Sequence, residues 1–276
     1  MLSELERLAD KEPDNYKKIW ELFGVVLKEG VYEDFERREA LLALARFSTT
    51  AGGETWRSLK DYVAALKPNQ SAIYYLAGDD IERLKSSPHL EGFRARGIEV
   101  LLLADPVDSF WVMSATAFDG KPFKSVTQGA ADLAAIPLID AKNEPAPELQ
   151  DAVKQFLVFM KTTLGDTVAE VRASERLTDS AVCLVASDVG PDRALERILA
   201  GARRLSSASK PVLEVNPRHQ LVVALAGLGG EQVSLKEDAV HLLLDEARVL
   251  EGDRPADPRS FSERLARVLE KSVGKG

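Results

Sequence analysis

The sequence predicts a mixed α/β protein: a helical bundle joined to a small α/β/α layer, then a mixed α/β domain with a three-stranded sheet and a C-terminal helix pair. The chain has 276 residues, 45% hydrophobic and 29% charged, which suits about two globular domains. Strand, helix and strand patterns follow one another between residues 72 and 103, as in parallel α/β units. Alanines and prolines at 129–147 indicate a linker before a second series of helices and strands.

Residues 1–128 are expected to form the first domain. Apolar residues at three- and four-residue spacing predict a helix that begins near Pro13 and ends at Gly30, and another from about Glu33 to Phe47. Ser58 is expected to cap a short helix. We expect strands at 72–76, 98–103 and 123–126, and helices at 79–96, interrupted at Pro88, and at 106–115.

Residues 148–276 are expected to form the second domain. Its apolar, β-favouring runs are short and alternate with amphipathic helical patterns, which predicts a mixed α/β domain. We expect strands at 168–171, 181–185 and 212–215, and helices at 148–164, 191–205, 235–250 and 258–268.

Composition excludes several classes of function. The net charge is −8, and basic clusters such as Arg203-Arg204 are short and lie among acids, so the chain is a poor candidate for nucleic-acid binding. No apolar run approaches the roughly 18 residues that a membrane helix needs, so no membrane partner is expected. A single cysteine, Cys183, allows no intramolecular disulfide, which fits a reducing cytosol.

The residues themselves indicate no nucleotide site. A Walker loop, with two glycines followed by Lys and Ser or Thr, is absent from the sequence. Gly227–Gly230 follows the apolar run Leu221–Leu225 as a dinucleotide loop would, but Gln232 stands where the third glycine belongs. Because Asn216–His219 precedes that run, Leu221–Leu225 fits a helix start as well as a strand.

Catalytic and metal-ligating patterns are also lacking. His89, His219 and His241 are far apart in sequence, and Cys183 has no Cys-x-x-Cys partner, so no metal site is expected. Cys183 lies in an apolar strand, where a buried structural thiol is the simpler interpretation. Acid pairs such as Asp79-Asp80 precede helices, where they favour the helix dipole, so no catalytic residue is assigned.

Several motifs, in order, resemble those of the bacterial heat-shock protein 90 chaperones. They are Phe23–Gly30 (FGVVLKEG), Ser86–Glu91 (SSPHLE), Gly97–Leu103 (GIEVLLL), Phe118–Phe123 (FDGKPF), Arg176–Ser180 (RLTDS) and Leu213–Pro217 (LEVNP). The resemblance covers nearly the whole chain. It implies that residues 1–128 are the C-terminal part of the chaperone middle domain and residues 148–276 the C-terminal dimerisation domain.

The resemblance implies a fragment of an ATP-dependent molecular chaperone of the stress response. Its partners would be a second copy of itself, unfolded or partly folded client proteins and other chaperones, in the cytoplasm. ATP and Mg²⁺ are expected on an N-terminal domain of a longer parent, in which Met1 is an internal residue. The parent is then expected to be an ATPase, whereas this chain is expected to carry no cofactor and to be no enzyme.

The last two helices carry more apolar residues than packing within one chain requires. By the resemblance, they pair with their copies as a four-helix bundle about a two-fold axis. The alternative is that they pack only within the monomer. The expected interface residues are Leu242, Leu243, Phe261, Leu265, Val268 and Leu269.

Client contact is expected first on the helix at 106–115. The resemblance places Ser109, Phe110 and Met113 at the contact sites, where the family has an acid, a tryptophan and an asparagine, so the surface here is more apolar. Flat rings and an adaptable methionine suit binding to many partners. Trp111 and Val112 are expected to be core.

A second client contact is expected on the helix at 191–205, which projects into the cleft between protomers in the family. Leu195, Ile198 and Leu199 fall on one face of it. The alternative is a helix that packs on its own sheet.

Two other functions remain open at this point. One is an α/β enzyme with an unrecognised site, which a perturbed acid or base in a deep cleft would favour. The other is a scaffold that dimerises without binding clients, which a client-binding assay would distinguish from a chaperone.

Overall fold

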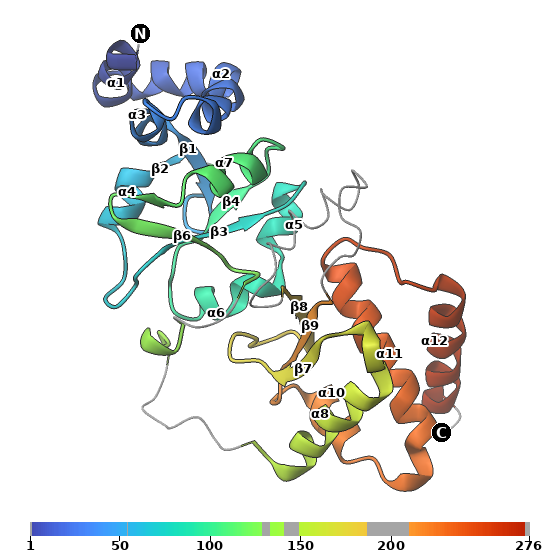
Figure 1. The fold of residues 1–276 in the computed structure, drawn as a ribbon. Helices are drawn as coiled ribbons and strands as arrows, with labels where there is room; N and C mark the ends of the chain where they lie inside the picture. The colour runs from blue at the N-terminus through green and yellow to red at the C-terminus, as the bar shows by residue number, and fades with distance from the viewer. Residues whose placement is uncertain (1, 54, 129–132, 141–148, 187–209, 274–276) are drawn as a thin grey trace. The chain divides into compact units, whose positions relative to one another are not determined.

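The computed structural model describes residues 2–53, 55–128, 133–140, 149–186 and 210–273 (Figure 1). The chain divides into two compact units. Unit 1 comprises Met1–Ser86 and Arg96–Val126, and unit 2 comprises Ser87–Ala95 and Thr127–Gly276. The structure is of the mixed α/β class that the sequence predicts. The expected domain division, with a linker at 129–147, stays a prediction.

Unit 1 contains a six-stranded sheet in the order β2-β1-β4-β3-β6-β5. The strands β4, β3 and β6 run parallel, and Tyr75 of β3 pairs with Leu101 of β4 and Ser125 of β6. β3 and β4 are buried along their whole length, as expected for central strands covered on both faces. The strands are β1 (Arg46–Thr49), β2 (Arg57–Ser58), β3 (Ile73–Ala77), β4 (Leu101–Leu103), β5 (Ala117–Phe118) and β6 (Lys121–Ser125).

The helices of unit 1 include a bundle at its N-terminal end, drawn in blue in Figure 1. Ser58 caps α4 as predicted, because its hydroxyl accepts a hydrogen bond from the Asp61 amide at 3.1 Å. The helices are α1 (Leu2–Lys11), α2 (Pro13–Glu33), α3 (Arg38–Leu44), α4 (Leu59–Ala64), α5 (Ile81–Lys85) and α7 (Asp108–Ser114).

Three sequence predictions for unit 1 are wrong. The sequence predicts three strands, at 72–76, 98–103 and 123–126, but β1, β2 and β5 extend the sheet to six. The helix expected to reach Phe47 ends at Leu44, and Phe47 lies in β1 with its side chain buried. Gly30 does not end α2, which continues to Glu33. A Cβ at Gly30 would lie 3.0 Å from Cδ1 of Leu41, so this glycine permits close packing of α3 on α2.

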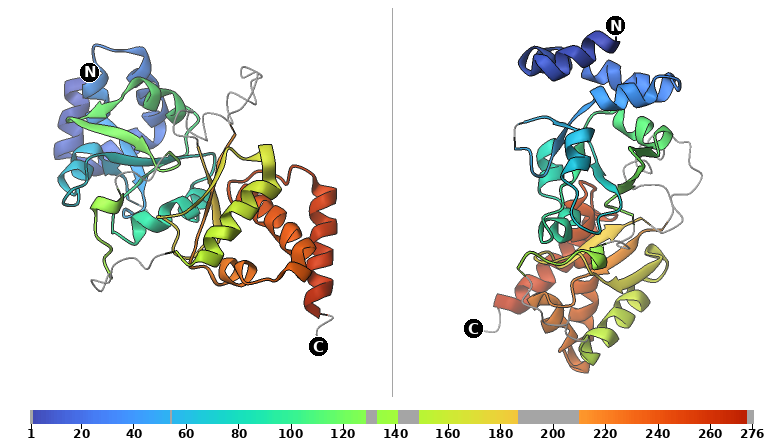
Figure 2. Two further views of the ribbon diagram at one scale, coloured as in Figure 1. Left: turned by 60° about the horizontal axis from the view of Figure 1, so that its bottom comes forward. Right: turned by 90° about the vertical axis from the view of Figure 1, so that its left-hand side faces the viewer.

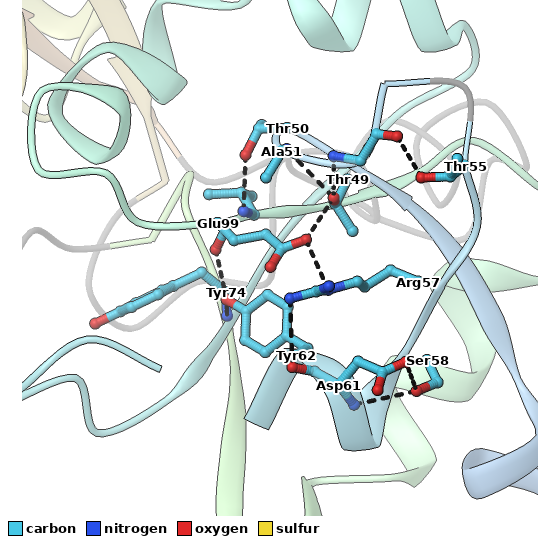
Figure 3. A network of polar contacts seen from close by, with 12 residues as sticks. Thr49, Thr50, Ala51, Thr55, Arg57, Ser58, Asp61, Tyr62, Tyr74 and Glu99 are labelled. Atoms are coloured by element: carbon cyan, nitrogen blue, oxygen red, sulfur yellow. Dashed lines mark hydrogen bonds and ion pairs between the residues drawn. The ribbon is translucent and has the colours of Figure 1, made fainter. Parts of the chain in front are cut away.

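A polar network holds the start of strand β4 to the rest of the sheet (Figure 3). The Glu99 carboxylate accepts a hydrogen bond from the Thr49 hydroxyl at 2.6 Å and lies 3.3 Å from Nε of Arg57. The buried Tyr62 hydroxyl donates to the Glu99 carbonyl and accepts from the Tyr74 amide at 3.0 Å. Side chains of β1, β2 and α4 thus fix the backbone at Glu99, just before β4. β4 in turn leads to α7.

Unit 2 contains a three-stranded sheet, as the sequence predicts, in the order β7-β9-β8. β7 and β9 are parallel, and β8 is antiparallel to β9. α8 and α11 pack against this sheet, and their apolar side chains form one core with Leu184, Leu213 and Val215. The elements are α8 (Asp151–Leu164), β7 (Glu170–Ala173), β8 (Val182–Val185), β9 (Val212–Val215), α10 (Gln220–Ala226), α11 (Val233–Leu250) and α12 (Pro258–Val273).

The segment Ser87–Ala95 lies between two strands of unit 1 in sequence but belongs to unit 2. It contains a 3-10 turn, Pro88–Leu90, and the short helix α6 (Glu91–Arg94). The Glu91 carboxylate accepts hydrogen bonds from the amides of Thr178, Asp179 and Ser180 at 2.7, 2.9 and 3.1 Å. A Cβ at Gly92 would lie 2.8 Å from Cα of Arg176, so only glycine allows this close approach.

A buried ion network supports the face of this sheet opposite the main core. The Glu214 carboxylate on β9 accepts hydrogen bonds at 2.9 Å from Arg176, Arg172 and Ser174. Arg176 is fully buried. Burial favours the neutral acid, but Arg176 and then Arg172 and Ser174 outweigh it and hold the pKa of Glu214 below its ordinary value. The carboxylate is therefore the form that stabilises unit 2.

Glu214→Gln should lower the free energy of unfolding of unit 2 by about 3 kcal/mol at pH 7, because it removes the carboxylate charge that pairs with the buried Arg176 guanidinium. Since the pKa of Glu214 is depressed in the fold, its contribution is present above the unfolded pKa of about 4.3 and is lost as pH falls through the folded value. The difference between variant and parent chain should therefore shrink in acid.

Urea unfolding measures this difference. All three tryptophans lie in unit 1, so loss of circular dichroism without a change in tryptophan fluorescence reports unit 2. The control is Glu170→Gln on the neighbouring strand β7, where the side chain is exposed. Equal midpoints for Glu214→Gln and the control would contradict the prediction.

Candidate functional site

Helix α7 is positioned by one buried aromatic side chain. Trp111 is fully buried, and its ring centroid lies 5.5 Å from that of Phe47 on β1 and 5.2 Å from that of Phe123 on β6. Its indole nitrogen donates a hydrogen bond of 2.7 Å to the Asp108 carboxylate. The prediction that Trp111 is core is therefore confirmed, and Val112 is half-buried.

Ion pairs of the buried Lys28 connect α2 to α7. Nζ of Lys28 lies 2.7 Å from the Asp105 carboxylate and 2.8 Å from that of Asp108, and 5.1 Å from the centroid of the Phe47 ring. Burial raises the pKa of Asp108, although Lys28 and Trp111 oppose this shift. Lys28 and Asp108 are both almost inaccessible to water, so removing Lys28 would leave the Asp108 carboxylate buried without its cation.

With Trp111 and Asp108 turned inward, the opposite side of α7 is exposed. Phe110 is 47% exposed and Met113 is 58% exposed, three residues apart on that side. The Phe110 ring centroid lies 6.0 Å from that of Tyr32 on α2. Ser109, also expected to contact clients, is buried. We call Phe110 and Met113 the α7 surface and leave Ser109 out of it.

An open apolar groove lies in unit 2 among α10, α11 and α12. Its volume is about 630 Å³, and Glu231, Glu246 and Lys271 are the charged residues in its lining. α11 and α12 lie side by side in Figures 1 and 2, where they are orange and red. The apolar lining comprises Leu221, Ala224, Leu225 and Leu228, then Leu235, Ala239, Leu242 and Leu243, and Val268. We call this the unit 2 groove.

The residues expected at the dimer interface fall into three groups. Leu242, Leu243 and Val268 line the unit 2 groove, and Leu243 also belongs to the core of unit 2. Leu265 and Leu269 are exposed on α12. Phe261 is half-buried near the start of α12. The six residues therefore surround one region formed by α11 and α12.

α12 is held to α11 by charge as well as by apolar contact. Asp238 on α11 accepts hydrogen bonds of 2.9 and 2.6 Å from the guanidinium of Arg267, and Arg264 lies 3.9 Å away. The Arg267 hydrogen bonds are the main reason that the pKa of Asp238 is lowered. None of the sixteen residues of α12, all of them described, is buried. An amphipathic helix without a buried residue has an apolar face that is not fully covered by its own chain.

Sequence reasoning missed the contribution of α10 to the groove. The run Leu221–Leu225 is helical, not a strand, and Nδ1 of His219 caps it by accepting from the Leu221 amide at 3.2 Å. The strand that a dinucleotide loop requires is therefore replaced by a helix whose exposed side includes Leu221 and Ala224. The spacing of Leu221, Ala224, Leu225 and Leu228 is the helical signal that could have identified it.

The second expected client contact cannot be placed. Leu195, Ile198 and Leu199, with the whole helix expected at 191–205, lie outside the described residues. Among the residues that the structure does describe, no group of three or more His, Cys, Asp or Glu side chains is arranged to hold a metal ion. Nor does any described helix have the length and apolar character needed to cross a bilayer.

Exposed apolar surfaces of this kind are typical of proteins that bind other protein chains. Comparison with known proteins identifies the class more closely: the chain belongs to the Hsp90 protein family, whose model matches residues 1–275.

The chain is 62% identical, over all 276 residues, to the chaperone protein HtpG of Mesorhizobium japonicum. It is 63% identical over 273 residues to HtpG of Nitrobacter winogradskyi, and 59% identical over 273 residues to HtpG of Rhizobium meliloti. These matches cover 100%, 99% and 99% of this chain but 44%, 42% and 43% of the three relatives. The chain therefore spans less than half the length of the curated relatives it matches.

Lys28→Met should lower the free energy of unfolding of unit 1 by about 3 kcal/mol, because it leaves the buried Asp108 carboxylate without its cation. Tryptophan fluorescence during urea unfolding measures this, since Trp111 contacts Asp108 directly. Lys17→Met on the exposed side of α2 is the matched control. Adding Asp108→Asn to Lys28→Met should recover part of the loss. A double variant less stable than the single one would show that the two charges do not act as a pair.

Proposed function

We propose that this chain is the part of an HtpG-type chaperone that forms a homodimer and binds partly unfolded client proteins. One structural observation supports it most directly: α12 borders an apolar groove and exposes Leu265 and Leu269, yet buries none of its side chains within its own chain. A helix that contributes so little to its own core is best explained by a role between chains.

Dimerisation is the use that fits the unit 2 groove. α11 and α12 of a second copy would supply apolar side chains to fill the groove. About a two-fold axis, each copy would contribute the same residues to the interface. The resulting four-helix arrangement would cover Leu242, Val268 and Leu269 at once. Asp238 and Arg267 keep α12 in the orientation that this pairing needs.

Client binding is the use that fits the α7 surface. Phe110 offers a flat ring, and Met113 an adaptable thioether, on a helix that Trp111 and Lys28 hold rigidly from behind. Such a surface accepts many apolar partners without requiring one sequence.

The remaining activities belong to the longer protein. We propose that ATP and Mg²⁺ bind an N-terminal domain of the full-length chaperone, that this domain hydrolyses ATP, and that the protein acts in the cytoplasm together with other chaperones. The names of the relatives support a chaperone, and this chain would be its dimerising and client-binding part.

Leu265→Asp should convert the chain from a dimer to a monomer at micromolar concentration, because it places a charge in the apolar seam. We expect the dimer to weaken at least about 100-fold, measured by analytical ultracentrifugation over a concentration series. Val158→Asp changes an exposed valine on α8 and is the matched control. A parent chain that sediments as a monomer at micromolar concentration would refute the proposed dimerisation.

Phe110→Ser combined with Met113→Ser should weaken binding of a fluorescent, unfolded apolar peptide about tenfold or more, because it removes the two large exposed side chains of α7. The melting temperature and the dimer should change little, since neither side chain is buried. The control is Val223→Ser, an exposed valine on α10. A large loss of stability would show that these residues belong to the core, and unchanged affinity in a stable variant would place client binding elsewhere.

A further inference from the structure

A second exposed apolar stripe runs along α2. Leu22 is 76% exposed and Val25 is 45% exposed, and Val26 beside them is also exposed. In an α-helix, Leu22, Val25, Val26 and Tyr32 fall within about 120° on one face. Leu22 and Tyr32 are ten residues apart, so the stripe is about 15 Å long. Leu22, Val25 and Val26 contribute nothing to the core of unit 1, which α2 enters through Tyr16, Trp20 and Val31 instead.

The stripe on α2 is continuous with the α7 surface. Tyr32 stands at one end of the stripe, and its ring centroid lies 6.0 Å from that of Phe110. The Lys28 ion pairs with Asp105 and Asp108 also link α2 to α7. The two helices therefore present a mostly apolar surface that runs from Met113 through Phe110 and Tyr32 to Val25 and Leu22, with Glu29 between Tyr32 and Val25.

The charges around the junction are acidic. Glu29 lies on the same face of α2 between Val25 and Tyr32, and Glu33 follows Tyr32; both are exposed. Both carboxylates are close enough to act on the Tyr32 hydroxyl electrostatically. Asp105 is partly exposed beside α7, whereas Lys28 is buried and already paired. Lys18 stands at the far end of the stripe, beyond Leu22.

We propose that the client-binding surface continues from α7 along this face of α2, and that its occupant is a non-native polypeptide segment whose apolar residues are flanked by Lys or Arg. This inference rests on the proposed client binding at α7. The aromatic contact between Tyr32 and Phe110 joins the surfaces of the two helices, and the carboxylates of Glu29 and Glu33 select the charge of the flanks. A longer stripe also explains how a chaperone surface built on a seven-residue helix holds an extended segment.

Two fluorescent peptides of 16 residues test this inference with the 276-residue chain at low salt. They share one apolar centre and differ only in flanks of Lys or of Glu. We expect the Lys-flanked peptide to bind about tenfold tighter. Leu22→Gln with Val25→Gln should weaken its binding about fivefold, whereas the control Val158→Gln on α8 should not. Gln favours helix and the sites are exposed, so circular dichroism should be unchanged. Glu29→Gln with Glu33→Gln should abolish the preference for Lys flanks.

The outcomes separate this inference from the proposed function. If Phe110→Ser with Met113→Ser weakens binding but the α2 variant binds as the parent chain does, client binding at α7 stands and its extension to α2 is wrong. If the Glu29 and Glu33 variant keeps the full preference for Lys flanks, the proposed charge selection is wrong. If neither the α7 nor the α2 variant changes the affinity of either peptide, both proposals fall.

Discussion

The placement of Trp111 determines what unit 1 can offer to a partner. α7 has only seven residues, so a single large side chain decides which way the helix faces. Trp111 packs between Phe47 and Phe123, from strands at different positions of the same sheet, and its nitrogen binds Asp108. Because one face is fixed in this way, Phe110 and Met113 must point outward. Their exposure follows from the packing of the core and not from a loosely held helix.

Ion pairs fix the orientation of helices that apolar contacts alone would leave free to move. Apolar contacts are non-directional, so a short helix held by them alone could rotate or slide on the apolar surface beneath it. Lys28 prevents this for α7, since it reaches two carboxylates at 2.7 and 2.8 Å at once. Asp238 does the same for α12, through two hydrogen bonds to one guanidinium. In both units, an ion pair fixes the orientation of a helix, α7 or α12, that exposes apolar side chains.

Sequence patterns are informative wherever they are long. The long helix at 235–250 can be predicted, because many apolar residues repeat in one register, and the strand at 72–76 can be predicted because its apolar run is unbroken. β2 and β5 have two residues each, too few for any period to appear, and they form only because β1 and β6 are there to pair with them. Gly30 has the character of a helix end in sequence, but it serves the contact with Leu41, a residue of the next helix. The same limit applies to the site. Spacing identifies the apolar faces of α11 and α12, whereas the part played by α10 and the burial of Ser109 depend on tertiary packing.

The two apolar surfaces differ in a way that matches the two kinds of partner proposed for them. The unit 2 groove is hollowed and lined mostly by leucine, valine and alanine from three helices, so it has definite ridges and hollows. Such relief favours one complementary partner, and a second copy of the same helices, as proposed above, would supply it by symmetry. The surface of α7 and α2 consists of side chains that project into solvent, among them aromatic rings and a methionine, and it is bordered by carboxylates. It offers apolar area together with long-range charge in place of specific contacts, which suits segments that bind briefly and differ from one client to the next. The proposed self-association and the proposed client binding would require different surface properties, and the unit 2 groove and the surface of α7 and α2 differ in this way.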